Sequence, residues 1–288
     1  MSVSERVGDD RDGASPGYPG GRIRSHLRVE CPGRGQPSTD VLFADLVAQA
    51  LTAIGARSCD RVNSPRVTLW VFLGQVLNAD HSCRAAVPRL NADRVSRRLR
   101  PCSARTGAYC QARQCLPERF VSNVARRTGR TLDDRVDPRW LGRGRRVYVY
   151  DGSAVSMPNT PANPRDYPRP DTQKPGLGFP LARLAAVFSL ACGAVIELGI
   201  CRNAGKGQSE LWLLRALPGV FRPGDVLLAD RLMCAWTEMV MLKLRGVDSV
   251  ARLGKRRADF GRGKRLGPGD QVVKWLKPRK PRSIDQAP

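Results

Sequence analysis

The stretch "DVLLADRLMC", residues 225–234, joins an apolar run to Asp230 and Arg231. Residues 226–229 are all apolar, which is typical of a strand buried within a sheet. A carboxylate left unpaired in a protein core costs several kcal/mol of folding free energy. The sequence therefore allows three placements for Asp230: the open end of the strand, an ion pair with a cation, or a metal site.

A second strand is predicted in "VYVYDGSAVSM", residues 147–157, which is rich in β-branched and aromatic residues. Asp151 follows its first four residues, and we place Asp151 at the end of this first strand. Further elements are predicted in this order: two strands in 181–202, a helix in 209–220, the strand that ends at Asp230, a helix in 234–247 and a strand in 248–254.

This order of elements is similar to the ribonuclease H-like fold, an α/β fold with a mixed sheet whose first and fourth strands are neighbours. Such strands would bring Asp151 and Asp230 together. Two carboxylates a few Å apart repel each other, and sharing divalent ions such as Mg²⁺ or Mn²⁺ would stabilise them. Two ions about 4 Å apart can activate the attacking oxygen and stabilise the leaving oxygen of a phosphodiester. Taken singly, Asp151 could be only a turn residue and Asp230 only an ion-pair partner of Arg231.

The chain is predicted to have four parts. Residues 1–37 are rich in Gly, Pro, Ser and Arg without periodicity, which predicts a disordered tail. Apolar residues at helical spacing predict an all-helical domain in 38–140, for which we expect DNA binding. Residues 145–253 form the predicted ribonuclease H-like core, which is incomplete, and residues 254–288 are a basic tail or the start of an insertion region.

Charge and cysteine content limit the classes of function that are possible. The 288 residues carry a formal net charge of +23, which points to a polyanionic partner and most simply to nucleic acid. Nine cysteines without a CxxC pair and only two histidines argue against a zinc site and favour reduced thiols. No segment approaches the roughly 18 consecutive apolar residues of a membrane span. We expect a cytoplasmic protein associated with the nucleoid.

Three long motifs resemble DDE transposases of bacterial insertion sequences, in the insertion-sequence-four group with its Tyr-Arg-Glu-Lys signature. They are "YVYDGSAVSMPNTPANPRDYPRPDTQKPGLGFPLARL" (148–184), "AGKGQSE" (204–210) and "RPGDVLLADR" (222–231). The helical segment resembles the N-terminal region of that group in "TLWVFLGQVLNADHSCRAAVPRLN" and "CSARTGAYCQARQCLP". The resemblance extends over about residues 38–282.

The resemblance implies a metal-dependent enzyme of DNA transposition. Asp151 resembles the family's first metal-binding acid and Asp230 its second, with Mg²⁺ or Mn²⁺ as cofactor. A metal-activated water would cut double-stranded DNA at the terminal inverted repeats of the element, and the freed 3′-hydroxyl would attack target DNA. Lys206 and Glu210 lie in the matching "GKGQSE" stretch, where we expect structural or DNA-contact roles. Homo-oligomers, with itself or with full-length transposase, are the expected protein partners.

Basic residues near the second acid and in the C-terminal part are candidates for phosphate contacts. Residues 251–288 hold 12 Lys and Arg against 3 Asp and Glu. Exposed basic runs are often only solvated surface, but beside a DNA-processing fold they can hold the DNA backbone. The candidates are Lys206, Arg231, Lys255, Arg256, Arg257, Lys264 and Arg265.

The third acid of the family has no counterpart in this chain. That acid is a Glu in a Tyr-x2-Arg-x3-Glu context, and none of the acids after Asp230 has this context. Glu238 lies in the helix directly after the Asp230 strand, too early to take the role. An alternative function is therefore a truncated, inactive transposase that binds DNA and inhibits the full-length enzyme. A ribonuclease H-like nuclease with another substrate is a third possibility. We expect exposed apolar surface where the helix with the third acid would cover the sheet.

Overall fold

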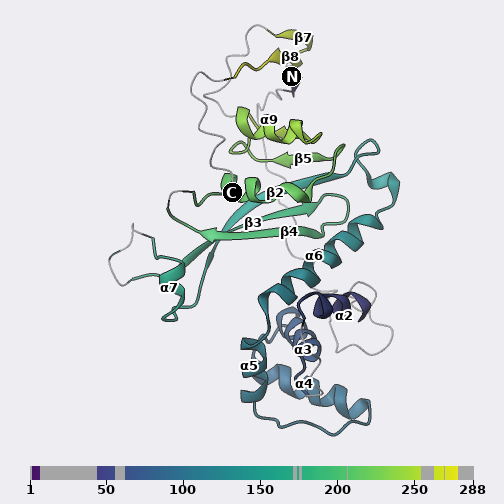
Figure 1. The fold of residues 1–288 in the computed structure, drawn as a ribbon, viewed down its shortest axis with the longest axis vertical. Coiled ribbons are helices and arrows are strands. Elements are labelled where there is room, and N and C mark those ends of the chain that lie inside the picture. The colour runs from purple at the N-terminus through teal and green to yellow at the C-terminus, as the bar shows by residue number, and fades with distance from the viewer. Residues whose placement is uncertain are drawn as a thin grey trace, which may run out of the picture. The chain divides into compact units, whose positions relative to one another are not determined.

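The computed structural model describes residues 2–6, 44–55, 62–170, 174, 177–205, 207–253, 263–268 and 270–277. The described residues divide into two compact units, and the division falls inside one helix, between Thr131 and Leu132. The first unit contains the helices before this point. The second contains the sheets and the remaining helices, and each unit is treated by itself below (Figure 1).

Helices and connecting turns make up the described residues of the first unit. The helices are α2 (Ala44–Ala53), α3 (Pro65–Leu77), α4 (Cys83–Ser96), α5 (Gly107–Gln114) and most of α6 (Glu118–Asp134). Ser64 and Ser82 precede α3 and α4 and cap them, because their hydroxyls accept hydrogen bonds from Val67 N and Ala85 N. A small core joins α2, α3 and α6 through Val47, Ala50, Leu69, Phe120 and Val124.

From the sequence alone, a break or kink is expected at Pro88 and an interruption of the helical pattern near Pro117, and the two expectations have different outcomes. The predicted interruption near Pro117 is confirmed, because α5 ends at Gln114 and α6 begins at Glu118. The predicted break or kink at Pro88 is not a break, since α4 continues through this residue to Ser96. Pro88 is only the sixth residue of the helix, so one backbone hydrogen bond is lost and the rest of the helix forms.

A five-stranded mixed sheet forms the centre of the second unit. Its order is β4-β3-β2-β5-β6, with β2 antiparallel to β3, β3 antiparallel to β4, and β5 parallel to both β2 and β6. The strands are β2 (Val147–Ser156), β3 (Leu181–Ser189), β4 (Val195–Arg202), β5 (Val226–Ala229) and β6 (Asp248–Ala251). Three helices accompany them: α7 (Asn163–Asp166), α8 (Glu210–Ala216) and α9 (Trp236–Leu244). The protein is thus a mixed α/β protein. The predicted order of the strands and of helices α8 and α9 is confirmed. The first and fourth predicted strands, β2 and β5, are neighbours.

The strand predicted in 147–157 is confirmed as β2, but the placement of Asp151 at the end of this strand is wrong. The antiparallel ladder between β2 and β3 continues past Asp151↔Ala186 to Ser156↔Leu181. Asp151 and Gly152 therefore lie inside a strand and not in a turn. The parallel ladder between β2 and β5 does end here, since its last pair is Tyr150↔Ala229. Asp151 is the first residue of β2 beyond the β5 pairing.

The two faces of this sheet differ in their cover. Residues directly opposite each other in a ladder share a face, and neighbours along a strand alternate between faces. One face is buried against α8 and α9, and its main core residues are Tyr148, Tyr150, Ala185, Val187, Leu213, Leu214, Leu227 and Leu242. The face on which Asp151 lies also carries Leu198 and Ile200, whose exposed fractions are 50% and 44%. We call these the covered face and the open face. The open face fits the expected exposed apolar surface.

A smaller sheet has the order β1-β8-β7 and includes part of the predicted N-terminal tail. Its strands are β1 (Ser2–Arg6), β7 (Lys264–Gly267) and β8 (Asp270–Lys274). Residues 2–6 thus form a strand along β8, which differs from the predicted disordered tail, while 7–37 lie outside the described residues. The predicted basic tail, 254–288, likewise contains β7 and β8.

Two further observations concern membrane-spanning helices and disulfides. Among the described residues, no helix combines the length and the apolar character that crossing a membrane requires. No disulfide joins the cysteines in this part of the chain, which are Cys83, Cys102, Cys110, Cys115, Cys192, Cys201 and Cys234.

Candidate metal and nucleic-acid site

The two predicted acids follow directly after one strand pair. Asp230 is the first residue after β5, and Asp151 is the residue of β2 that follows the last β2–β5 pair. Both side chains are exposed. The parallel ladder is the cause of this placement, because parallel strands end at the same edge of a sheet. Of the three placements that the sequence allows for Asp230, the structure has the first: its carboxylate lies at the open end of the strand and is not buried.

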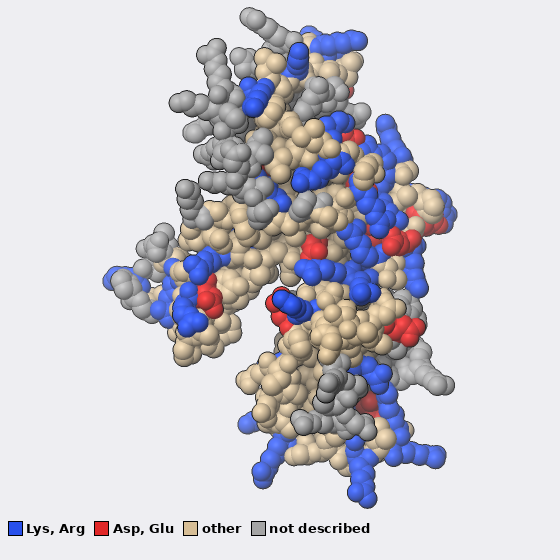
Figure 2. Space-filling model, viewed as in Figure 1, with Lys and Arg blue, Asp and Glu red and all other residues tan. Residues whose placement is uncertain are grey.

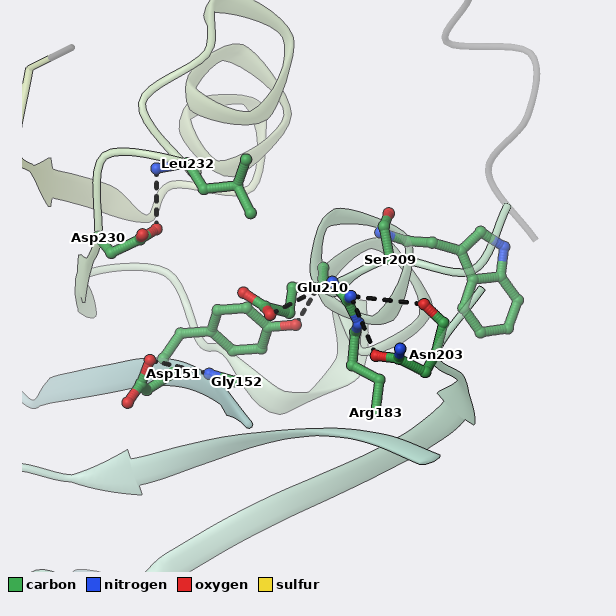
Figure 3. Close-up of polar contacts among 10 residues, drawn as sticks. Asp151, Gly152, Arg183, Asn203, Ser209, Glu210, Asp230 and Leu232 are labelled. Atoms are coloured by element: carbon green, nitrogen blue, oxygen red, sulfur yellow. Dashed lines mark hydrogen bonds and ion pairs between the residues drawn. The ribbon is translucent and has the colours of Figure 1, made fainter. Parts of the chain in front are cut away.

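Each carboxylate accepts a hydrogen bond from its own backbone neighbourhood. Asp151 Oδ1 lies 2.9 Å from Gly152 N, and Asp230 Oδ1 lies 2.8 Å from Leu232 N. Figure 3 shows the two side chains turned to these amide groups. Among the described residues no ion pair involves Asp230, so the alternative of a pair with Arg231 gains no support. Each acid keeps its second oxygen for a further ligand.

The donors present fit a magnesium site that is rich in water. Mg²⁺ is usually bound through one or two carboxylates together with waters and substrate phosphates. Asp151 and Asp230 supply two carboxylates of this kind at one sheet edge. In the described part of the chain, no group of three or more His, Cys, Asp or Glu side chains could hold a metal ion. The two acids therefore fit an open two-carboxylate site and not a closed three-acid site.

Glu238 is unavailable as a third acid. It lies in the first turn of α9, only 3% of its side chain is exposed, and it forms an ion pair with Arg215 of α8. The ion pair joins α8 to α9, and the Glu238 carboxylate is buried in this contact. The prediction that Glu238 does not take the third role is consistent with this burial.

Glu210 has a contact that sequence reasoning missed. It is the first residue of α8, and its side chain lies against the backbone of Gly152, next to Asp151 (Figure 3). A Cβ atom at position 152 would lie 2.4 Å from Glu210 Cδ, so any other residue here would have to displace the Glu210 side chain. The available signal was a glycine within a β-branched run, which often marks a close approach of another group. The alternative interpretation of the Asp-Gly pair as a turn competes with this signal.

The predicted phosphate-contact residues fall partly inside the described structure. Arg231 is exposed directly after Asp230, and Lys264 and Arg265 are exposed on β7. Lys206 and residues 255–257 (Lys255, Arg256 and Arg257) lie outside the described residues. Figure 2 shows Lys and Arg side chains over much of the visible surface of both units, with Asp and Glu more scattered among them. Such a surface can hold a polyanion without reading its sequence.

No protein-family model matches the chain, and no curated protein matches it. The interpretation of the site therefore rests on the residues and on their placement in the sheet.

Proposed function

We propose that this chain is a transposase-type enzyme that cuts and joins DNA with the help of a divalent metal ion. The observation that carries the proposal is the placement of Asp151 and Asp230, which follow the last pair of the parallel β2–β5 ladder and are both exposed. The strand order β4-β3-β2-β5-β6 supports a ribonuclease H-like core. The motif resemblance and the net charge of +23 support DNA as the substrate.

The side chains have separate tasks in this proposal. Asp151 and Asp230 would hold Mg²⁺ or Mn²⁺ through their carboxylate oxygens. When bound, such an ion supplies Lewis-acid activation of water and stabilises the leaving oxygen of the phosphodiester. The backbone N–H groups of Gly152 and Leu232 orient the two carboxylates through the hydrogen bonds described above. Arg231, beside Asp230, would contact a phosphate of the bound strand.

The helical unit would add sequence-independent DNA contacts. Arg98, Arg100 and Arg105 are exposed in the segment between α4 and α5. Guanidinium groups bind phosphate oxygens well because their planar donors match the phosphate geometry. We propose that this unit holds double-stranded DNA at the ends of the element, that the enzyme acts as a homo-oligomer, and that it works at the nucleoid.

The test is DNA cleavage by the full chain. A plasmid with the terminal repeats of the element that encodes this chain is incubated with Mg²⁺ and then assayed for nicks at the repeat ends. The expected result is Mg²⁺-dependent nicking that Asp151→Asn and Asp230→Asn each reduce to background. Asp166→Asn, which changes an exposed acid on α7, is the matched control and should cut like the wild type. Absence of nicking by the wild-type chain, or unchanged nicking by Asp230→Asn, would contradict the proposal.

A second candidate function is DNA binding without cleavage. It is favoured by the absence, among the described residues, of a group of three metal-ligating side chains and by the burial of Glu238. A chain of this type would occupy the element's ends and inhibit full-length transposase. Gel-shift retention of terminal DNA at moderate salt, with no nicking at any Mg²⁺ concentration, would select this function over the first.

A further inference from the structure

The first turn of α8 contacts β2 at Tyr150 and at Gly152. Tyr150, which is buried, donates a hydrogen bond from its hydroxyl to Glu210 O over 2.6 Å. Burial raises the pKa of this hydroxyl, so it stays a donor at neutral pH. The Glu210 side chain lies across Gly152 itself. The helix start and the strand around Asp151 are thus held together through one residue of α8.

Arg183 of β3 holds the Glu210 side chain in this position. Its Nη1 atom lies 3.5 Å from Glu210 Oε1, and its Nη2 atom lies 3.3 Å from Asn203 Oδ1. The pair is largely withdrawn from solvent, since 27% of the Arg183 side chain and 22% of the Glu210 side chain are exposed. Ser209 caps the helix by accepting a hydrogen bond from Trp212 N, which fixes Glu210 as the first helical residue.

Glu210 acts from the opposite face of the sheet to Asp151. Gly152 pairs with Ala185, which belongs to the covered face, and Asp151 pairs with Ala186 on the open face. Glu210 therefore reaches Asp151 only through the backbone: it abuts Gly152, and Gly152 N donates to Asp151 Oδ1. A glycine within a strand is less favourable than alanine. The contact with Glu210 favours glycine here, because a Cβ atom at this position would displace the Glu210 side chain.

We propose that Glu210, held by Arg183, is a positioning residue that fixes the orientation of the Asp151 carboxylate for metal binding. This inference rests on the proposed metal-dependent function. It assigns Glu210 no contact with the metal ion or with DNA. Residues that orient metal ligands typically change metal affinity about 10- to 100-fold when they are mutated.

The experiment measures Mn²⁺ binding to the full chain by electron paramagnetic resonance, without DNA. Glu210→Ala is expected to weaken Mn²⁺ binding by about tenfold or more, and Asp151→Asn to weaken it further. Glu210→Gln keeps the contact with Gly152 and loses the charge, so it should lie between Glu210→Ala and the wild type. Circular dichroism checks that each variant is folded at the temperature of the assay.

A pair of variants separates positioning from general packing. Gly152→Ala brings a methyl group against Glu210 and is expected to weaken Mn²⁺ binding. Gly152→Ala combined with Glu210→Ala removes this clash, so the double variant should be more stable to heat than Gly152→Ala alone but should still bind Mn²⁺ weakly. If double-variant binding returns to wild-type strength, Glu210 only fills space and the inference is overturned.

The outcomes also distinguish this inference from the proposed function. Wild-type affinity in folded Glu210→Ala, with weakened binding in Asp151→Asn, overturns the positioning role and leaves the metal site standing. Unchanged binding in Asp151→Asn overturns both.

Discussion

The covered face and the open face of the five-stranded sheet use neighbouring residues of the same strands in opposite ways. On β2, Tyr148 and Tyr150 are buried against α8 and α9, whereas Asp151 is exposed. On β4, Cys201 is buried, whereas Ile200 is 44% exposed. The strands are the same, so the difference arises from what packs on each face.

The covered face therefore contributes mainly to stability, and the open face carries the side chains that are available for chemistry. Apolar side chains on the covered face are removed from water and provide the larger part of the stabilisation, at about 25 cal/mol per Å² of apolar surface buried. The open face provides exposed carboxylates with oxygens free for ligands. Substitutions on the two faces should therefore have different consequences, and the following experiments are designed to test this.

The largest effect on stability is expected for a buried carboxylate on the covered side. Glu238→Ala leaves Arg215 of α8, which is 18% exposed, without its ion-pair partner, which should lower the free energy of unfolding by about 3–5 kcal/mol. The control is Asp151→Ala, which removes an exposed carboxylate from the open face and should change stability by about 0.5 kcal/mol or less. Urea unfolding of both variants measures the two values. Equal losses would contradict the division between the faces.

An intermediate effect is expected for leucines on the two faces. Leu227 of β5 is 1% exposed and belongs to the covered core, so Leu227→Ala should cost about 2–4 kcal/mol. Leu198→Ala, the same change at a residue that is 50% exposed, should cost less than about 1 kcal/mol. Thermal unfolding of the two variants at one pH makes the comparison. A loss for Leu198→Ala as large as for Leu227→Ala would show that the open face is covered in solution.

The smallest effect is expected for Asp248, the first residue of β6, whose contribution to the stability of the fold depends on pH. Asp248 accepts a hydrogen bond from Lys243 at 2.7 Å and pairs with Arg145 at 2.8 Å, and these cations lower the pKa of its carboxyl below the usual 3.8. A pKa that is lower in the folded state adds stability above the unfolded value near pH 4, and this stability is lost as the pH falls through the folded pKa. The side chain is 42% exposed, so solvent weakens the effect.

Asp248→Asn should therefore lower the melting temperature slightly at pH 7 and leave it unchanged near pH 2. Asp166→Asn, on exposed α7, should show no such pH dependence. Melting curves at several pH values measure both. A loss of stability that persists at pH 2 would show that the Asp248 charge is not its source.

Local sequence patterns were enough to predict most of the fold. The β-branched run at 147–150 and the apolar run at 226–229 predicted two strands, and the order of elements between and after them was confirmed. Short-range periodicity determines these elements, so a single sequence carries the signal. The strand at Ser2–Arg6 was missed because its pairing with β8 joins opposite ends of the chain, and no local pattern reports such a contact.

The candidate site was predicted in part. Asp151 and Asp230 were placed at one sheet edge from the strand order, and the structure brings their strands together. The role of Gly152 was not predicted, because an Asp-Gly pair is compatible with a turn and with a strand that another side chain crosses. The ladder with β3 shows that Gly152 lies within a strand, and the residue that crosses it, Glu210, is 58 positions along the chain, beyond the reach of a local pattern.

The central claim is that Asp151 and Asp230 share one divalent-metal site. The most direct measurement replaces Mg²⁺ by Fe²⁺ and adds ascorbate and hydrogen peroxide, so that hydroxyl radicals cut the backbone close to the bound ion. We predict cuts both in β2 near Asp151 and directly after β5 near Asp230, competed by Mg²⁺ and absent in Asp151→Asn. Cuts at only one of these segments, or cuts that persist in Asp151→Asn, would contradict the account.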